Sequence, residues 1–249
     1  VSVVAPVGLD HTDMLGDSLA EIATEKAGII KPDRYLISAA QDPEVATILL
    51  DTARKQNAKY AFEGVEFGVV ERDRAVGGQL LTLRGLAGEY PEIELPLHGE
   101  HQGQNASLAL AAVEAFFGGD RALARDVVLA GFAQVRSPGR LEMIRSEPLV
   151  VLDAAHNPHG VRAASTAFKE AFELSHVHAV VGILGEKDAL GIFEVLREEY
   201  VDSTDATFRL YLSASESSRA IAPEELQEIA LDAGFDENII TVYDHLDEA

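Results

Sequence analysis

The second half of the chain alternates apolar β-type segments with amphipathic helical segments, and this alternation limits the possible folds more than any other feature. We expect strands at 149–153, 177–184, 208–213 and 239–243, and helices at 158–174, 189–200 and 223–233. Continuous apolar strands that alternate with amphipathic helices are typical of parallel β-α-β units. The sequence therefore predicts an α/β fold with a parallel sheet in this half.

The first half has a more mixed pattern. We expect a short buried strand at 1–7 and helices at 18–27, 44–56, 105–117 and 121–134. The first helix begins with the capping box Ser18–Glu21, and Gly28 is expected to end it in a left-handed conformation. Short β-type runs between 60 and 97, separated by glycines, indicate hairpins. The helix at 105–117 is expected to bury one stripe, made of Leu108, Ala109, Ala112, Val113, Phe116 and Phe117.

Ser137-Pro138-Gly139 is the expected domain boundary, which gives parts 1–137 and 138–249. Charge then excludes some functions. The chain has 42 acidic and 20 basic residues, a formal net charge of −22, which argues against nucleic acid and anionic membranes as partners. It has no Cys, no apolar run long enough to span a membrane and no signal-peptide pattern, so a cytoplasmic location is the expectation.

Ligands of open parallel sheets gather where the strands end. In this chain that rule selects residues 153–159, 185–188, 213–219 and 244–245. Asp153 ends a strand that we expect to be buried, and Arg140 follows the domain boundary. The two could bind phosphate or form a salt bridge that stiffens the junction. Lys187 could meet a phosphate or a carboxylate, and Asp188 could cap the next helix.

Two residues of the first half have both a functional and a plain interpretation. His11 follows the first strand and could bind a metal or simply be exposed. Lys26 falls on the apolar face of its helix, where a neutral amine could add carbon dioxide and become an anionic metal ligand. Alternatively, Lys26 extends its ammonium to solvent at the helix end.

The remaining motifs are weaker. The His-x-x-His pairs His98–His101 and His156–His159 supply two ligands each, which is too few for a typical zinc site. Asn105 could cap its helix or hydrogen-bond a base edge or hydroxyl. Neither a Walker phosphate loop nor a Gly-x-Gly-x-x-Gly fingerprint occurs in the sequence.

Taken together, these segments resemble the folylpolyglutamate synthase/dihydrofolate synthase family, the folate-specific relatives of the Mur ligases. The resemblance rests on GLDHTDMLG at 8–16, IATEKAGIIK at 22–31, GEHQGQNA at 99–106, PGRLE at 138–142, LDAAHNP at 152–158 and GEKD at 185–188. The segments follow one another in order along nearly the whole chain. The Asp-His-Thr and Glu-Lys-Ala-Gly motifs are the most specific of them.

The resemblance implies an ATP-dependent carbon–nitrogen ligase that adds L-glutamate to dihydropteroate, to a reduced folate, or to both, through an acyl phosphate. It implies that His11 and a carbamylated Lys26 hold Mg²⁺, and that both act in catalysis with Arg140. It also implies that Asn105, Arg140, Asp153 and His156 face ATP, with Lys187 and Asp188 near the glutamate or phosphate. The fold implied is part of a P-loop-type Mur ligase central domain with a β-rich appendage, followed by a Rossmann-like domain.

The family's phosphate loop and a magnesium-binding Glu lie upstream of the Asp-His-Thr motif, so we expect 1–249 to be an internal piece, truncated at its end and inactive alone. A monomer is implied. Two other interpretations stay open: a cell-wall Mur-type ligase, and a non-catalytic binding module. The sequence does not separate dihydrofolate synthase from folylpolyglutamate synthase activity, and the acidic excess is interpreted as solvation.

Overall fold

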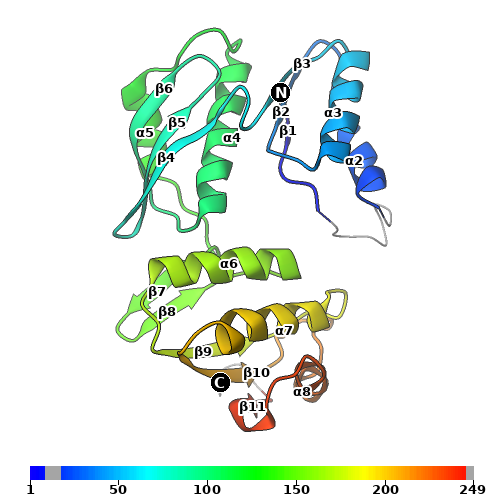
Figure 1. Cartoon of the computed structure of the whole chain (residues 1–249), viewed down its shortest axis with the longest axis vertical. Coiled ribbons are helices and arrows are strands. Elements are labelled where there is room, and N and C mark those ends of the chain that lie inside the picture. The colour runs from blue at the N-terminus through cyan, green and yellow to red at the C-terminus, as the bar shows by residue number, and fades with distance from the viewer. Residues whose placement is uncertain (9–17, 245–249) are drawn as a thin grey trace. The chain divides into compact units, whose positions relative to one another are not determined.

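The computed structural model describes residues 1–8 and 18–244, and the chain divides into two compact units, Val1–Arg136 and Ser137–Ala249 (Figure 1). Within the described ranges, no helix is both long and apolar enough to cross a membrane. Each unit has its own sheets and its own hydrophobic cores.

The first unit contains a parallel sheet that is covered on both faces. Its strands are β1 (Ser2–Val4), β2 (Tyr35–Ser38) and β3 (Lys59–Phe62), in the order β1-β2-β3. Helices α2 (Leu19–Ala27) and α3 (Pro43–Lys55) contribute to the core on one face, and helix α4 (Glu100–Phe116) contributes to the core on the other. Leu36 and Ile37 are consecutive on β2 and are fully buried, one in each core.

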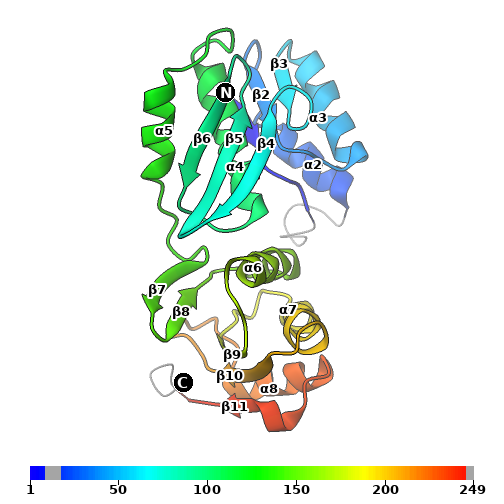
Figure 2. The same ribbon diagram turned by 60° about the vertical axis from the view of Figure 1, so that its left-hand side comes forward.

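Helix α4 also packs against a second, antiparallel sheet (Figure 2). This sheet consists of β4 (Gly68–Ala75), β5 (Gly78–Arg84) and β6 (Glu89–Leu95), and α5 (Arg125–Ala133) packs against β6. The hairpins predicted between 60 and 97 are therefore confirmed. The run at 59–62 is different, because β3 joins the parallel sheet instead.

Two predictions about α4 are wrong. Phe116 and Phe117 are 74% and 66% exposed, and the buried apolar residues are Ala106, Leu108, Leu110, Ala111 and Ala115. The burial is spread over two flanks because the helix contacts two sheets, whereas a single stripe presupposes one. The helix also begins at Glu100 and not at Asn105, directly after Gly99, whose positive φ of 96° suits glycine.

The capping box of α2 is confirmed, but its predicted end is wrong. The Glu21 amide donates to Ser18 Oγ (3.3 Å), and the Ser18 amide donates to Glu21 Oε2 (3.2 Å). Gly28 is right-handed, with φ −59° and ψ −18°. Its amide donates to Glu25 O (3.0 Å), so the helix closes with a tight turn rather than a left-handed cap.

A buried carboxylate fastens α4 to the second sheet. Glu114 is fully buried and accepts hydrogen bonds from the amides of Leu86 and Ala87 and from the Tyr90 hydroxyl (2.6 Å). The same hydroxyl accepts from the Leu123 amide (2.7 Å). Burial, and then the hydrogen bond to Glu114, raise the pKa of Tyr90 to about 12. Tyr90 therefore stays protonated and donates to Glu114.

The second unit contains a parallel sheet made of three of the four predicted strands, which confirms the α/β fold. Its strands are β9 (His176–Val181), β10 (Thr207–Leu212) and β11 (Ile240–Val242), in the order β11-β10-β9. Its helices are α6 (Pro158–Ala171), α7 (Ala189–Arg197) and α8 (Pro223–Asp232), with a π-helical turn at Glu198–Asp202 and a 3-10 turn at Glu237–Ile239. Phe208, Leu210 and Leu212 alternate along β10 and fill one core with residues of α7 and α8.

One predicted parallel strand is wrong. The run at 149–153 forms β8 (Leu149–Leu152), which pairs antiparallel with β7 (Glu142–Ser146). Leu149 and Leu152 are 39% and 48% exposed, so β8 is not a buried strand. A short apolar run fits a hairpin as well as a parallel sheet, and residues 142–146 give no strong strand signal that would reveal the partner.

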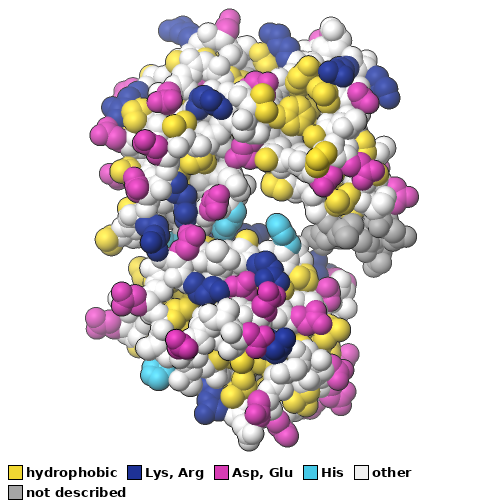
Figure 3. Space-filling model, viewed as in Figure 1, with side chains coloured by type: hydrophobic (Ala, Val, Ile, Leu, Met, Phe, Trp, Pro, Cys, Tyr) yellow, Lys and Arg dark blue, Asp and Glu magenta, His cyan; other side chains and the backbone are white. Residues whose placement is uncertain are grey.

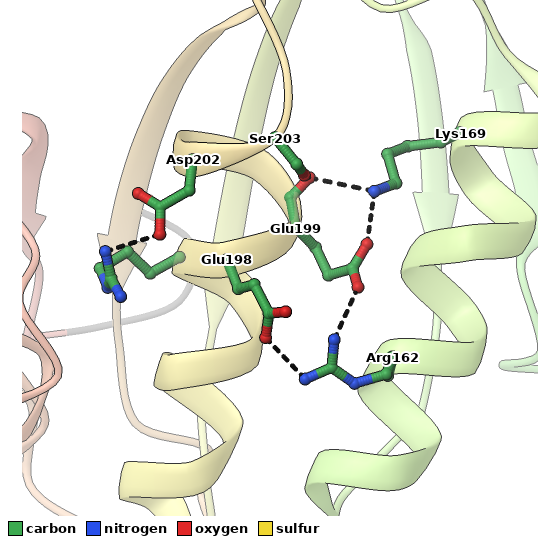
Figure 4. A network of polar contacts seen from close by, with 7 residues as sticks. Arg162, Lys169, Glu198, Glu199, Asp202 and Ser203 are labelled. Atoms are coloured by element: carbon green, nitrogen blue, oxygen red, sulfur yellow. Dashed lines mark hydrogen bonds and ion pairs between the residues drawn. The ribbon is translucent and has the colours of Figure 1, made fainter.

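An ionic network joins α6 to the π-helical turn (Figure 4). Arg162 contacts Glu198 (2.7 Å) and Glu199 (2.9 Å), and Lys169 also contacts Glu199. The Glu199 side chain is only 12% exposed, so its charge is compensated by two cations from one helix. The Arg162 guanidinium, as donor and as nearby charge, lowers the pKa of Glu198.

We expect Glu114→Ala to lower the free energy of unfolding of the first unit by about 3 kcal/mol or more, because it leaves buried amides and a hydroxyl unpaired. Tyr90→Phe removes two hydrogen bonds, the one donated to Glu114 and the one accepted from the Leu123 amide, and should cost about 1–3 kcal/mol. Denaturant unfolding checks both values. The matched control is Glu89→Ala, an exposed carboxylate of β6, which should change little. Equal effects of Glu114→Ala and Glu89→Ala would contradict this role.

The Arg162–Glu198 contact should make stability pH-dependent. A carboxyl with a lowered native pKa stabilises the fold above its unfolded pKa, about 4.3, and loses this effect as the pH falls through the native value. Unfolding measured from about pH 6 to pH 3 should therefore show a steeper acid loss in the wild type than in Arg162→Ala. Parallel curves for the two proteins would refute the expectation.

Candidate functional site

Backbone hydrogen bonds bring Arg140 and Asp153 together. The Ala154 amide donates to Gly139 O (2.8 Å), and the Leu141 amide donates to Asp153 Oδ2 (2.9 Å). Asp153 Oδ1 accepts from the amide two residues further on (2.7 Å). The carboxylate thus fastens the turn that carries Arg140 to the loop after β8. Both side chains are exposed, and no ion pair joins these two described residues, so the structure does not show the salt-bridge alternative.

The same loop continues into α6. His156 Nδ1 lies 3.1 Å from Ala154 O, which keeps the imidazole beside the loop. Asn157 is the N-cap, since its Oδ1 accepts from the Gly160 amide (2.7 Å), and Pro158 occupies the first turn. This cap and proline pair is the one that the sequence indicates.

The N-terminus of α7 lies beside that of α6. Asp188 caps α7 through a bond from the Gly191 amide to its Oδ1 (2.9 Å). A Cβ placed on Gly191 would lie 2.8 Å from Pro158 Cγ, so the two helices approach closely here. Lys187, half-buried, directly precedes Asp188. Two helix N-termini with Arg140 and Lys187 on the adjoining loops form an arrangement that suits an anion such as a phosphate.

Arg219 is a candidate that our residue-level sequence analysis missed, although it ends the 213–219 cluster. Its carbonyl accepts from the Gly185 amide (2.8 Å), and its Nη1 contacts Glu186 Oε1 (2.8 Å). Leu184 also forms an antiparallel bridge with Ala220. The strand-end rule could have identified Arg219, because it is the cation on the loop next to Lys187.

Lys26 is placed differently from the prediction. It lies in the last turn of α2, but its side chain is exposed rather than on the buried face, which is made of Ile22, Ala23 and Ala27. The long stem carries the ammonium to solvent at the helix end, as the snorkelling alternative describes.

Asn105 is exposed in the second turn of α4, where its side-chain amide donates to Gln102 Oε1 (3.3 Å). Gln102 in turn contacts His101 Nε2 (3.2 Å). Because α2 and α4 belong to cores on opposite faces of the parallel sheet, the structure does not bring Lys26 and Asn105 onto one face. Burial lowers the pKa of His98, which precedes α4.

Two polar residues that the sequence analysis passed over follow β2 and β3. Gln41 accepts from the Val7 amide (2.9 Å) and donates to Ala5 O (2.9 Å), so it holds the segment that leads out of β1. Glu63 accepts from the Ala40 amide (3.1 Å) and from the hydroxyl of Ser107 in α4 (3.2 Å). Glu63 also lines a cavity of about 470 Å³ with Arg72, Arg84, Glu100 and Gln104, among others.

The metal site cannot be assembled from the described residues alone. His11 lies in 9–17, outside the part that the structure describes, as does His245. Across residues 1–8 and 18–244, no group of three or more His, Asp or Glu side chains is arranged to hold a metal. Of the two magnesium ligands implied by the resemblance, only Lys26 is described, and the His-x-x-His pairs do not complete a zinc site there.

Charged side chains are widely spread over the surface. On the face seen in Figure 3, acidic side chains are scattered over both units and interspersed with Lys and Arg. The acidic excess is therefore not gathered into one patch on this face.

Comparison with known proteins shows which family model and which named proteins the chain is similar to. Residues 139–249 match the family model "Mur ligase, glutamate ligase domain". The Mycobacterium tuberculosis dihydrofolate synthase/folylpolyglutamate synthase is 48% identical over 215 residues, which cover 83% of this chain and 44% of that protein. The chain spans about half the length of the curated relatives that it matches.

Solved structures of proteins with these names are similar to the chain over nearly its whole length. Mycobacterium tuberculosis folylpolyglutamate synthase complexed with ADP and AMPPCP superposes with a TM-score of 0.90 and 42% identity, covering 99% of this chain and 54% of that one. Escherichia coli FolC in complex with DHPP and ADP gives a TM-score of 0.78 and 26% identity, covering 99% of this chain and 54% of that one.

The close approach of the two helix N-termini generates a prediction. Gly191→Ala places a methyl group against Pro158 and the Asp188 carboxylate, so it should lower the free energy of unfolding of the second unit by about 1–3 kcal/mol. Gly131→Ala in α5, where a Cβ meets nothing within 4 Å, should instead stabilise its helix by up to about 1 kcal/mol. Denaturant unfolding of both variants measures these changes in the free energy of unfolding. If Gly191→Ala left that free energy unchanged, α6 and α7 could move apart at this point without cost.

Proposed function

Because the chain belongs to the folylpolyglutamate synthase/dihydrofolate synthase family, we propose that its protein is an ATP-dependent amide ligase that adds L-glutamate to dihydropteroate, to a reduced folate, or to both. The 48% identity to the Mycobacterium tuberculosis enzyme is the observation that carries this proposal. In domain terms, 1–137 is part of the ATP-binding central domain, and 138–249 is the glutamate ligase domain.

The proposed reaction has two steps. The carboxylate of the pterin substrate attacks the γ-phosphorus of ATP, which gives an acyl phosphate and ADP. The amino group of glutamate then attacks the acyl carbon, an amide forms, and inorganic phosphate leaves with the electron pair of the broken C–O bond. Such phosphoryl transfer depends mainly on positioning and on cations that compensate charge on the phosphates.

The second unit supplies groups suited to this task. Arg140 stands on a turn fixed by Asp153, and a guanidinium there can bind phosphate oxygens through two donors. The capped N-termini of α6 and α7 add oriented amides, with His156 beside the first and Lys187 and Asp188 at the second. We assign ATP to Arg140, Asp153, His156 and, from the first unit, Asn105.

We further propose His11 and Lys26 as magnesium ligands. A bound magnesium ion would compensate negative charge on the ATP phosphates. An exposed lysine can react with carbon dioxide only through its neutral fraction, and the carbamate formed would be an anionic oxygen ligand. Exposure of Lys26 leaves its amine accessible to carbon dioxide and to the ion.

The folate branch is favoured over the cell-wall branch. Relatives from Mycobacterium, Bacillus and Escherichia carry the name dihydrofolate synthase/folylpolyglutamate synthase. A cell-wall ligase would act on a nucleotide-linked muramyl substrate. A non-catalytic module would turn over neither substrate.

The test is glutamate-dependent release of ADP by the complete gene product, with dihydropteroate or tetrahydrofolate as acceptor. We expect activity in the wild type and a loss of about 100-fold or more in kcat/KM for Arg140→Ala and for Lys26→Ala. Arg145→Ala, an exposed arginine of β7, is the control and should keep full activity. Intact mass then reports whether Lys26 carries a carbamate. Activity with a muramyl substrate alone, or none from a folded protein, would overturn the proposal.

A further inference from the structure

Two loops at the C-terminal edge of the β9-β10 sheet are joined by their backbones. They are 182–188, after β9, and 213–220, after β10. The Gly185 amide donates to Arg219 O (2.8 Å), and the Ser213 amide donates to Val181 O (3.1 Å). The relative position of the loops is therefore set by main-chain bonds, and their side chains are available for other tasks.

Arg219 is oriented by an ion pair that adds little to the stability of the fold. Its Nη1 lies 2.8 Å from Glu186 Oε1, and the two side chains are 67% and 41% exposed. Exposed ion pairs of this kind add little to stability, and the loops are already fixed by main-chain bonds. The main effect of the pair is to orient a planar group with five N–H donors, a geometry suited to two-point binding of a carboxylate.

Lys187 lies on the same pair of loops, one residue after Glu186, and is half-buried. The two cations differ in chemistry, because Lys187 carries a compact ammonium and Arg219 carries a planar guanidinium. In a chain with a net charge of −22, a ligand with two negative groups is favoured where two cations lie on loops that are joined by a main-chain bond. A dicarboxylic amino acid is such a ligand.

We propose that Arg219 and Lys187 bind the two carboxylates of the incoming amino acid, and that Arg219 thereby selects L-glutamate over its amides. This inference rests on the proposed ligase function and adds a specificity-determining residue to it. The Arg219 guanidinium binds one carboxylate through two N–H donors, and the Lys187 ammonium binds the other. The amino group of the glutamate stays free to attack the acyl phosphate.

Steady-state kinetics of the complete gene product test the inference. We expect Arg219→Ala to raise KM for L-glutamate by about 10- to 100-fold, with KM for ATP changed less than twofold. Arg219→Lys, which keeps the charge but not the fork, should fall in between. Arg145→Ala is the matched control and should leave both KM values unchanged. A rise in KM for ATP with no change for glutamate would assign Arg219 to phosphate and overturn the inference.

A second comparison separates recognition from a general structural loss. The amides glutamine and isoglutamine each lack one carboxylate, so Arg219→Ala should lower kcat/KM for glutamate at least tenfold more than for one of them. Equal losses for all three would refute carboxylate recognition. Calorimetric binding of L-glutamate, with an ATP analogue present, gives a readout that does not require turnover. Unchanged binding in Arg219→Ala refutes the inference, whereas weakened binding in a protein without ligase activity refutes only the proposed function.

Discussion

The first unit depends on one helix that has to satisfy two sheets at once. Helix α4 contributes Leu108 and Ala111 to the core under the parallel sheet, and Ala106 and Leu110 to the core under the antiparallel sheet. Its rotation is fixed by Glu114, whose buried carboxylate accepts hydrogen bonds from two amides of the β5-β6 turn and from the hydroxyl of Tyr90 in β6. Rotating the helix about its axis would expose apolar surface and leave the buried Glu114 carboxylate without hydrogen-bond donors. Both changes would raise the free energy of the folded state.

In the second unit, the candidate site is positioned by main-chain contacts rather than by a shared helix. There the candidate site is assembled by main-chain bonds and helix caps: Asp153 fastens the turn of Arg140, Asn157 and Asp188 cap two adjacent helices, and Gly185 joins the loop of Arg219. Four separate stretches of sequence are held in place in this way. The side chains of Arg140, His156 and Arg219 remain exposed, which leaves them available for ligands.

Patterns that depend on local chemistry were predictable from the sequence. The capping box at Ser18, the Asn157-Pro158 start and the alternation around β9, β10 and β11 all have local causes. Features that depend on distant partners were not predictable. The burial of α4 reflects two sheets, the pairing of β8 reflects residues 142–146, and the exposure of Lys26 reflects where its stem can reach. For the candidate site, the motifs selected the second-unit residues and the strand-end rule reaches Arg219, whereas Gln41 and Glu63 required the fold.

The shared helix has a consequence for motion. Because α4 supplies side chains to both cores of the first unit, neither sheet can lose its packing without disturbing the helix that the other needs. Local opening of the β4-β5-β6 sheet alone is thereby suppressed, and the amide protons of both sheets should exchange with solvent through one common opening event. The two sheets then form a single cooperative unit in spite of their different topologies.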